Sequence, residues 1–290
     1  MSASPTTLLI VYGLAIAAVS LLGGLLPNWV RMTHTRTQMI MSFVSGFMLA
    51  VAFYHLLPHS LVLVGGVNAA DDVAWWLMVG LVGMLLLLRM FHFHQHDFST
   101  EEDGHHDHHH HHDHQAHSLS WVGIALGLGL HTLIDGVALG AALYGASTPG
   151  VTGLLGFGVF LAILLHKPLD AMSITTIMEA GGWSRSARAT INGIFAFVCP
   201  LGALLFYFGL GSVGVDEQRV VGLALAFSAG AFVCIALSDL LPEVHFHSHD
   251  RGKLTAAFLA GIVLAWGIGS VEPESSHALS PHHHGQEELR

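Results

Sequence analysis

Two short stretches, HTLIDG at residues 131–136 and HKPLDA at residues 166–171, decide how this chain folds. Each has a histidine followed four residues later by an aspartate, His131 with Asp135 and His166 with Asp170. Residues four apart share one face of an α-helix, so each stretch presents an imidazole and a carboxylate together, a pair that suits a metal ion. The surrounding sequence, from Leu119 to Met178, is otherwise strongly apolar. Ionisable groups inside membrane-spanning helices are costly and mark functional sites, so we expect a metal site within a bilayer.

The composition is that of an integral membrane protein. Of the 290 residues, 52% are hydrophobic and 10% are charged, and the mean hydropathy is +0.60. The formal net charge of −10 says little about partners, because the histidines can partly neutralise the acidic loops and tails below about pH 6.5, and nucleic acid is not an expected partner. Cys199 and Cys234 lie within apolar segments, which argues against a disulfide framework. The apolar run from Leu8 to Leu26 is too long for the core of a cleaved signal peptide and lacks basic residues before it, so we expect it to be the first span.

Eight apolar runs are long enough to cross the hydrocarbon core as helices, at about 20 residues each. We therefore predict an all-α integral membrane protein, with residues 1–290 forming one transmembrane domain. An even number of spans places both termini on the same side. The predicted spans are Thr7–Leu26, Met39–Val62, Val73–Phe93, Leu119–Tyr144, Val151–Met178, Ala187–Leu210, Val220–Leu241 and Leu254–Val271.

The basic residues of the loops predict the orientation in the membrane. Basic residues lie at or near the connections after spans one, three, five and seven. In that order they are Arg31 and Arg36, Arg89, Arg185 and Arg188, and Arg251 and Lys253. These connections share one face, which the positive-inside rule makes cytoplasmic. Acidic residues are concentrated in the loops of the other face and in the tail, residues 272–290. Both termini, including this tail, are therefore expected to be extracytoplasmic.

A short internal repeat relates spans two and seven. The segment His55-Leu-Leu-Pro58-His59 after Gly46 matches Asp239-Leu-Leu-Pro242-Glu243 after Gly230, at a constant offset of 184 residues. The predicted orientation makes the two copies inverted, and inverted repeats with a site at their interface are typical of transporters. The repeat places four further residues along the expected ion pathway. His55 and His59 are expected in an outer vestibule, and Asp239 and Glu243 in an inner one.

The segment at residues 94–118 is predicted to be a disordered cytoplasmic loop. The stretch 92–117 contains twelve histidines among acidic residues and has no apolar periodicity. It is either a solvated linker or a regulatory loop that binds zinc-like ions transiently. The regulatory candidates are His105, His106, His108, His109, His110, His111 and His112.

The two histidine–aspartate pairs favour zinc as the bound ion. Two helices that each offer an imidazole and a carboxylate supply four ligands, the number that zinc prefers. Cd²⁺, Fe²⁺ and Mn²⁺ are the other candidates for a mixed set of donors. The alternative is that each histidine bonds to its own aspartate or to a backbone carbonyl and merely joins helices. Met48 and Cys199 add soft donors on apolar faces, and Pro168 is expected to open the helix locally beside Lys167.

These motifs resemble those of the ZIP (Zrt-, Irt-like protein) family of divalent metal transporters. The stretch at 131–136 resembles the family's span-four signature, and the stretch at 166–171 resembles its span-five signature. The resemblance implies that His131, Asp135, His166 and Asp170 are ligands of the transport site, together with Met48, which matches a methionine of some bacterial members. It also implies zinc import into the cytoplasm, a 3+2+3 inverted-repeat arrangement of eight helices, elevator-like alternating access, a homodimer and, for a bacterial member, the inner membrane.

Three residues depart from the two-metal version of the family's site. Thr132 replaces a common asparagine, Lys167 replaces a common acid, and Cys199 replaces a common glutamate. The ammonium of Lys167 can occupy the position of a second cation and exclude that cation by charge repulsion in a low dielectric. We therefore predict a single-metal site in which Lys167 substitutes for the second cation, with Cys199 as an additional thiolate donor.

Two other functions fit parts of the sequence. A cation-diffusion-type metal exporter also uses histidine–aspartate pairs and histidine-rich loops, but such proteins usually have six spans and a soluble cytoplasmic tail. An intramembrane metal-dependent hydrolase would need an open coordination position and a general base, and the chain has no His-Glu-x-x-His element. It has no ATP-binding motif either, so we expect passive or secondary transport, without enzymatic activity or a catalytic cofactor.

Overall fold

The computed structural model describes residues 4–29, 34–91, 116–146, 154–212, 216–246 and 251–270. All regular elements in these ranges are helices, as the apolar runs predict. One span contains a π-helical turn, so α2, η1 and α3 follow one another without a loop. The elements are α1 (Pro5–Trp29), α2 (His34–Val51), the π-helix η1 (Ala52–Leu56), α3 (Leu57–Val64), α4 (Ala69–Phe91), α5 (Ala116–Gly145), α6 (Leu154–Ala180), α7 (Arg185–Gly209), the 3₁₀ turn η3 (Leu210–Ser212), α8 (Glu217–Phe246) and α9 (Arg251–Ser270).

Eight helical segments in the described ranges are long and apolar enough to cross a membrane, which confirms the predicted fold class. The second of these, Thr35–Val64, runs through α2, η1 and α3. The predicted histidine-rich loop lies outside the described residues from 94 to 115, whereas residues 116–118 belong to the start of α5. The tail at 272–290 also lies outside them.

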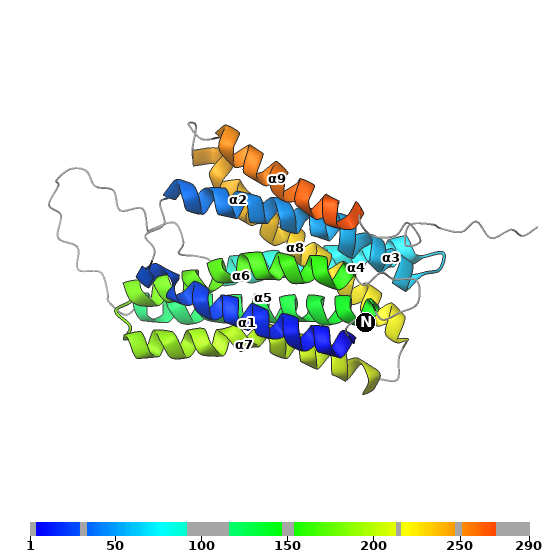
Figure 1. Ribbon diagram of the computed structural model, residues 1–290, viewed down its shortest axis with the longest axis horizontal. Coiled ribbons are helices and arrows are strands. Elements are labelled where there is room, and N and C mark those ends of the chain that lie inside the picture. Colours follow the sequence, from blue (N-terminus) through cyan, green and yellow to red (C-terminus); the bar gives the residue numbers. More distant parts are fainter. Residues whose placement is uncertain are drawn as a thin grey trace, which may run out of the picture.

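The helices run roughly side by side in two groups (Figure 1). One group contains α2, α8 and α9, and in it α2 packs along α9. Helix α4 packs along α8 of this group. The other contains α1, α5, α6 and α7, with α1 packed along α6 and α5 packed along α7. Helix α8 also contacts α5, and α6 also contacts α2, so the two groups meet along α5 and α6.

Glycines allow the closest of these helix contacts. A Cβ atom on Gly46 of α2 would collide with the carbonyl oxygen of Phe258 on α9, and one on Gly261 of α9 would collide with that of Phe43. Small residues let helix backbones approach closely where lipid provides no hydrophobic driving force. The α4 and α8 pair repeats the arrangement, because Gly80 lies against the Phe227 carbonyl and Gly230 lies against that of Leu77.

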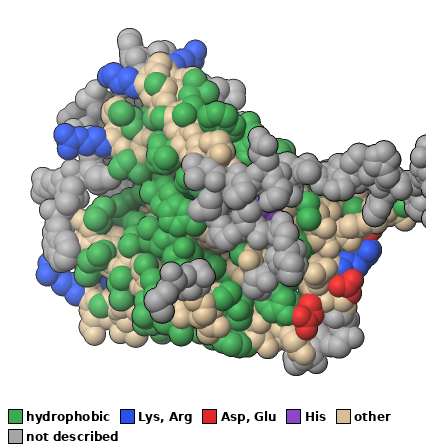
Figure 2. Space-filling view, turned by 45° about the vertical axis from the view of Figure 1, so that its right-hand side comes forward, with side chains coloured by type: hydrophobic (Ala, Val, Ile, Leu, Met, Phe, Trp, Pro, Cys, Tyr) green, Lys and Arg blue, Asp and Glu red, His purple; other side chains and the backbone are tan. Residues whose placement is uncertain are grey.

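The outer surface is apolar between two charged ends. Large side chains such as Trp75, Phe197 and Trp266 are exposed, while Phe47 and Phe232 are fully buried in the core. Figure 2 shows hydrophobic side chains over the middle of the molecule, with most of the visible lysines and arginines at one end and the acidic residues, beside a basic side chain, at the other. Such a broad apolar belt is expected of a surface that lies in lipid.

Candidate metal centre

The two histidine–aspartate pairs lie on neighbouring helices, α5 and α6. Helix α5 carries His131 and Asp135, and α6 carries His166 and Asp170, each pair one turn apart. Helix α6 remains continuous through Pro168, between its two candidate ligands. At this position α1 approaches closely, because a Cβ atom on Gly23 would collide with the backbone of Pro168.

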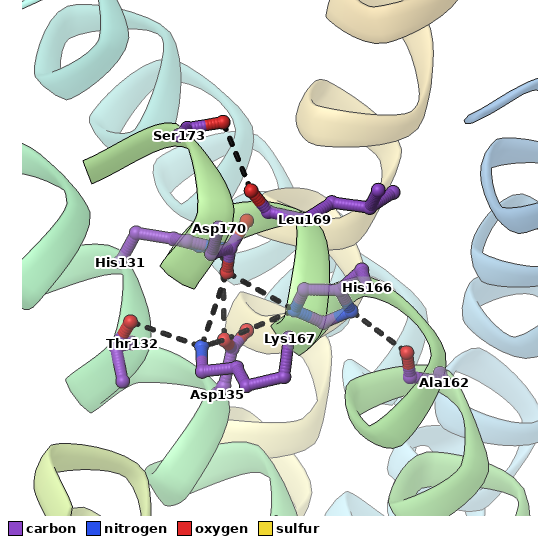
Figure 3. Close-up of polar contacts among 9 residues, drawn as sticks. All are labelled: His131, Thr132, Asp135, Ala162, His166, Lys167, Leu169, Asp170 and Ser173. Atoms are coloured by element: carbon purple, nitrogen blue, oxygen red, sulfur yellow. Dashed lines mark hydrogen bonds and ion pairs between the residues drawn. The ribbon is translucent and has the colours of Figure 1, made fainter. Parts of the chain in front are cut away.

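The four side chains converge on one point (Figure 3). Nε2 of His131 lies 3.5 Å from Oδ2 of Asp135 and 3.4 Å from Oδ2 of Asp170. Nε2 of His166 lies 3.2 Å and 3.9 Å from the same two oxygens. One ligand atom from each of the four residues lies within 4.8 Å of the others. Both histidines and Asp135 are buried, and the Asp170 side chain is 17% exposed.

These separations suit a small divalent cation. Ligand atoms about 2.0–2.2 Å from a tetrahedral zinc ion lie about 3.3–3.6 Å from one another. The four nitrogen–oxygen separations of 3.2–3.9 Å bracket that range. The donor set of two imidazoles and two carboxylates also matches what zinc binds. The cluster can therefore hold one zinc-sized ion with small side-chain movements.

The two histidines differ in how they are held. Nε2 of His166 lies in hydrogen-bond contact with Oδ2 of Asp135 at 3.2 Å, and its Nδ1 lies 2.7 Å from the carbonyl oxygen of Ala162, to which it can donate. Such a second contact fixes the tautomer and ring orientation of a metal ligand. Nδ1 of His131 and Oδ1 of Asp135 are buried and make no hydrogen bond with the described residues. His166 is therefore the more rigidly oriented of the two imidazoles.

Lys167 lies inside the cluster and is fully buried. Its Nζ donates to Oδ2 of Asp135 at 2.6 Å, to Oδ2 of Asp170 at 3.3 Å and to Oγ1 of Thr132 at 2.9 Å. It also lies 5.5 Å from the centre of the Phe195 ring on α7. The ammonium thus neutralises one of the two negative charges that the carboxylates carry in the protein interior.

Two further ligand candidates are buried but are not part of this converging group. Met48 is fully buried in the main hydrophobic core. Cys199 is a buried free thiol on α7, and among the residues that the structure describes the four converging side chains do not include it. The proposed ligand roles of Met48 and Cys199 therefore stay predictions.

The pathway histidines are packed between helices rather than exposed in a vestibule. His55 and His59 are 0% and 2% exposed. The His55 ring lies against Gly158 of α6 and Gly269 of α9, with its Nε2 3.1 Å from the carbonyl oxygen of Ala265. Asp239 and Glu243 belong to α8, and their side chains lie outside the described residues.

Three contacts of the cluster were not expected from the sequence. The hydroxyl of Thr132, the ring of Phe195 and the carbonyl of Ala162 contact Lys167 or His166. Helical spacing contains a signal for Thr132, because it lies three residues before Asp135 and thus on the same face of α5. The Phe195 contact joins two consecutive helices, α6 and α7, and helical spacing within one segment does not predict it.

The fold and this cluster define an integral membrane protein with a buried histidine–aspartate cluster between helices that could hold a metal ion. The family model described as ZIP Zinc transporter matches residues 88–271, more than half of the chain. This chain therefore belongs to the ZIP zinc transporter family.

Individual relatives are similar over part of the chain. It is 37% identical to zinc transporter ZIP9-B of Xenopus laevis over 130 residues, which are 42% of this chain and 41% of the relative. It is 32% identical to zinc transporter ZIP9 of Micropogonias undulatus over 151 residues, 50% of this chain and 47% of the relative. It is 30% identical to zinc transporter foi of Drosophila melanogaster over 143 residues, 48% of this chain and 18% of the relative. The chain covers less than half the length of each of these relatives.

Proposed function

We propose that this chain transports zinc into the cytoplasm through the cluster formed by His131, Asp135, His166 and Asp170. The observation that carries the proposal is the convergence of four ligand atoms from two neighbouring spans at separations that fit a tetrahedral zinc ion. Membership of the zinc transporter family and the names of the relatives support zinc as the ion. Cd²⁺, Fe²⁺ and Mn²⁺ are competing substrates for the same donors.

In this proposal the site binds one metal ion at a time, because the ammonium of Lys167 takes the place of a second metal ion. Its contacts to both carboxylates support the role of a built-in substitute for a second cation. A divalent ion placed beside this ammonium would meet strong repulsion in a low dielectric.

Alternating access would follow from an inverted 3+2+3 arrangement of the spans. The glycine contacts support this arrangement. On α2, Phe43 and Gly46 contact α9. The residues 184 positions later, Phe227 and Gly230 on α8, contact α4. The two halves thus use equivalent positions for equivalent contacts. In this arrangement α5 and α6 move the bound ion in an elevator-like manner between the two sides.

Three proposals concern the whole protein. The termini are extracytoplasmic, the protein forms a homodimer, and a bacterial member would reside in the inner membrane. Mass measurement of the detergent-solubilised protein tests the homodimer, and a monomer mass would refute it. The relatives named above are eukaryotic, so the bacterial assignment depends on the sequence resemblance alone.

The test is uptake of ⁶⁵Zn²⁺ into proteoliposomes by the wild type and by His166→Ala. Removing the oriented imidazole should reduce the initial rate at least tenfold, because one of four ligands is lost. Thr175→Val is the matched control, since Thr175 is buried on the same helix and, within the described ranges, its hydroxyl bonds to the carbonyl oxygens of Ala171 and Met172 on that helix. Equal uptake by His166→Ala and the wild type would refute the assigned site.

The same preparation separates the rival functions. An exporter of the cation-diffusion type would move zinc out of the cytoplasm, which oriented vesicles distinguish from import. A metal-dependent hydrolase would cleave a substrate and would not accumulate ⁶⁵Zn²⁺.

A further inference from the structure

The buried ammonium of Lys167 has three protons and three hydrogen-bond acceptors. A lysine ammonium is a donor only, with three N–H groups. Here the three acceptors are Oδ2 of Asp135, Oδ2 of Asp170 and Oγ1 of Thr132, at 2.6, 3.3 and 2.9 Å. The first two acceptors are the oxygens that also face the histidine Nε2 atoms. Thr132 is therefore the only one of the three that is not a proposed metal ligand.

Binding of a divalent ion would change the relative strengths of these three hydrogen bonds. The ion would take electron density from both carboxylate oxygens and would repel the nearby ammonium. The neutral groups that can hold the ammonium away from the ion are the hydroxyl of Thr132 and the face of the Phe195 ring, 5.5 Å from Nζ. Figure 3 shows Thr132 contacting Lys167 from the side opposite the carboxylate of Asp135.

We infer that Thr132 is a positioning residue that holds the ammonium of Lys167 partly away from the two carboxylate oxygens and so lets a divalent ion bind beside it. The inference depends on the proposed function, because it assigns Thr132 a role at the proposed zinc site. Without the hydroxyl, the third proton of the buried ammonium would lack an acceptor, which is costly. The ammonium would then compete for the carboxylate oxygens that the ion needs.

The test is a double-mutant cycle on zinc affinity, measured by titration calorimetry on the full chain in detergent. Thr132→Val keeps the shape of the side chain and removes the hydroxyl. It should raise the dissociation constant for Zn²⁺ about tenfold, the size expected for one hydrogen bond to a charged group. Thr132→Ser, which retains the hydroxyl, should restore affinity to within about twofold of the wild type, a change well below that of one hydrogen bond.

The second side of the cycle removes the ammonium. In a Lys167→Met background the hydroxyl has no charge to hold, so adding Thr132→Val should leave zinc affinity unchanged. An equal loss of affinity in both backgrounds would overturn the positioning role, because it would show that Thr132 acts directly on the ion or on the fold. A Thr132→Ser variant as weak as Thr132→Val would overturn it as well. If Thr132→Val does not fold, Thr132→Ala is measured in both backgrounds with the same outcomes.

His166→Ala separates failure of this inference from failure of the proposed function. If His166→Ala abolishes binding while Thr132→Val binds zinc like the wild type, the positioning role is wrong and the metal site remains. If His166→Ala binds zinc with unchanged affinity, both are wrong.

Discussion

Lys167 is the residue that most distinguishes this cluster from a plain set of metal ligands. A fully buried lysine is rare unless it is paired, and here it is paired with both candidate carboxylates. Its position next to His166 in sequence puts it at the same depth as the ligands, so its charge acts directly on any bound ion.

Replacing Lys167 by glutamate should allow a second ion to bind. The variant removes the ammonium and adds a carboxylate ligand beside Asp135 and Asp170, so equilibrium dialysis should give about two zinc ions per chain instead of one, since both the repulsion and the ligand number change. Lys167→Met is the control, because it removes the charge without adding a ligand and should still bind one. An unchanged stoichiometry in Lys167→Glu would count against the single-metal proposal.

At the residue scale the sequence predicts which four side chains converge better than it predicts the contacts that support them. His131, Asp135, His166 and Asp170 could be grouped because the four-residue spacing on two apolar segments places each pair on one face. The burial of His55 was not predicted, because its ring packs against Gly158 and Gly269 on two other helices, where glycine has no side chain and leaves room for it. Contacts of that kind depend on how the helices are arranged in space.

At the scale of helices, the glycine contacts determine how closely α4 and α8 approach. Gly80→Ala should lower the midpoint of thermal unfolding in detergent, because its methyl group would collide with the Phe227 carbonyl; such overpacking costs about 1–3 kcal/mol. Gly83→Ala on the same helix is the matched control, since no atom lies within 4 Å of its added Cβ. Equal midpoints for the two variants would contradict the close contact.

Apolar run length was sufficient to predict the eight spans but not their internal geometry. The π-helical turn at Ala52–Leu56 interrupts the second span just before Pro58. A π-turn contains more residues than an α-turn, so the faces assigned by helical spacing shift after it. A regular helix drawn through Thr35–Val64 therefore misplaces the residues that follow His55. Pro58 is a visible sign of irregularity, because it lacks a backbone donor, but it does not specify a π-turn.

At the scale of the whole molecule, the separation of charges at the two ends predicts the orientation. Arg185 and Arg251 begin α7 and α9 at the end expected to face the cytoplasm, whereas Glu217, directly after Asp216, begins α8 at the other end. Arg219 there pairs with Asp72 of α4 at 2.6 Å.

Cysteine labelling in intact cells tests this orientation. Asp216→Cys should react with a membrane-impermeant maleimide added outside, and Arg251→Cys should react only after permeabilisation, because cationic loops remain in the cytoplasm. The wild type is the control, since Cys199 and Cys234 are buried. The opposite labelling pattern would reverse the proposed topology.

The buried ammonium of Lys167 also affects the electrostatic free energy of burying the charged cluster in a low-dielectric interior. With both imidazoles neutral, as metal binding requires, the two carboxylates and Lys167 leave one net negative charge in the empty cluster and one net positive charge when a divalent ion is bound. The Born energy of a buried charge grows with the square of its magnitude, so the two states cost nearly the same. Without the lysine the empty cluster would carry a double charge and the filled one none, and the protein would be strongly biased against releasing its cargo.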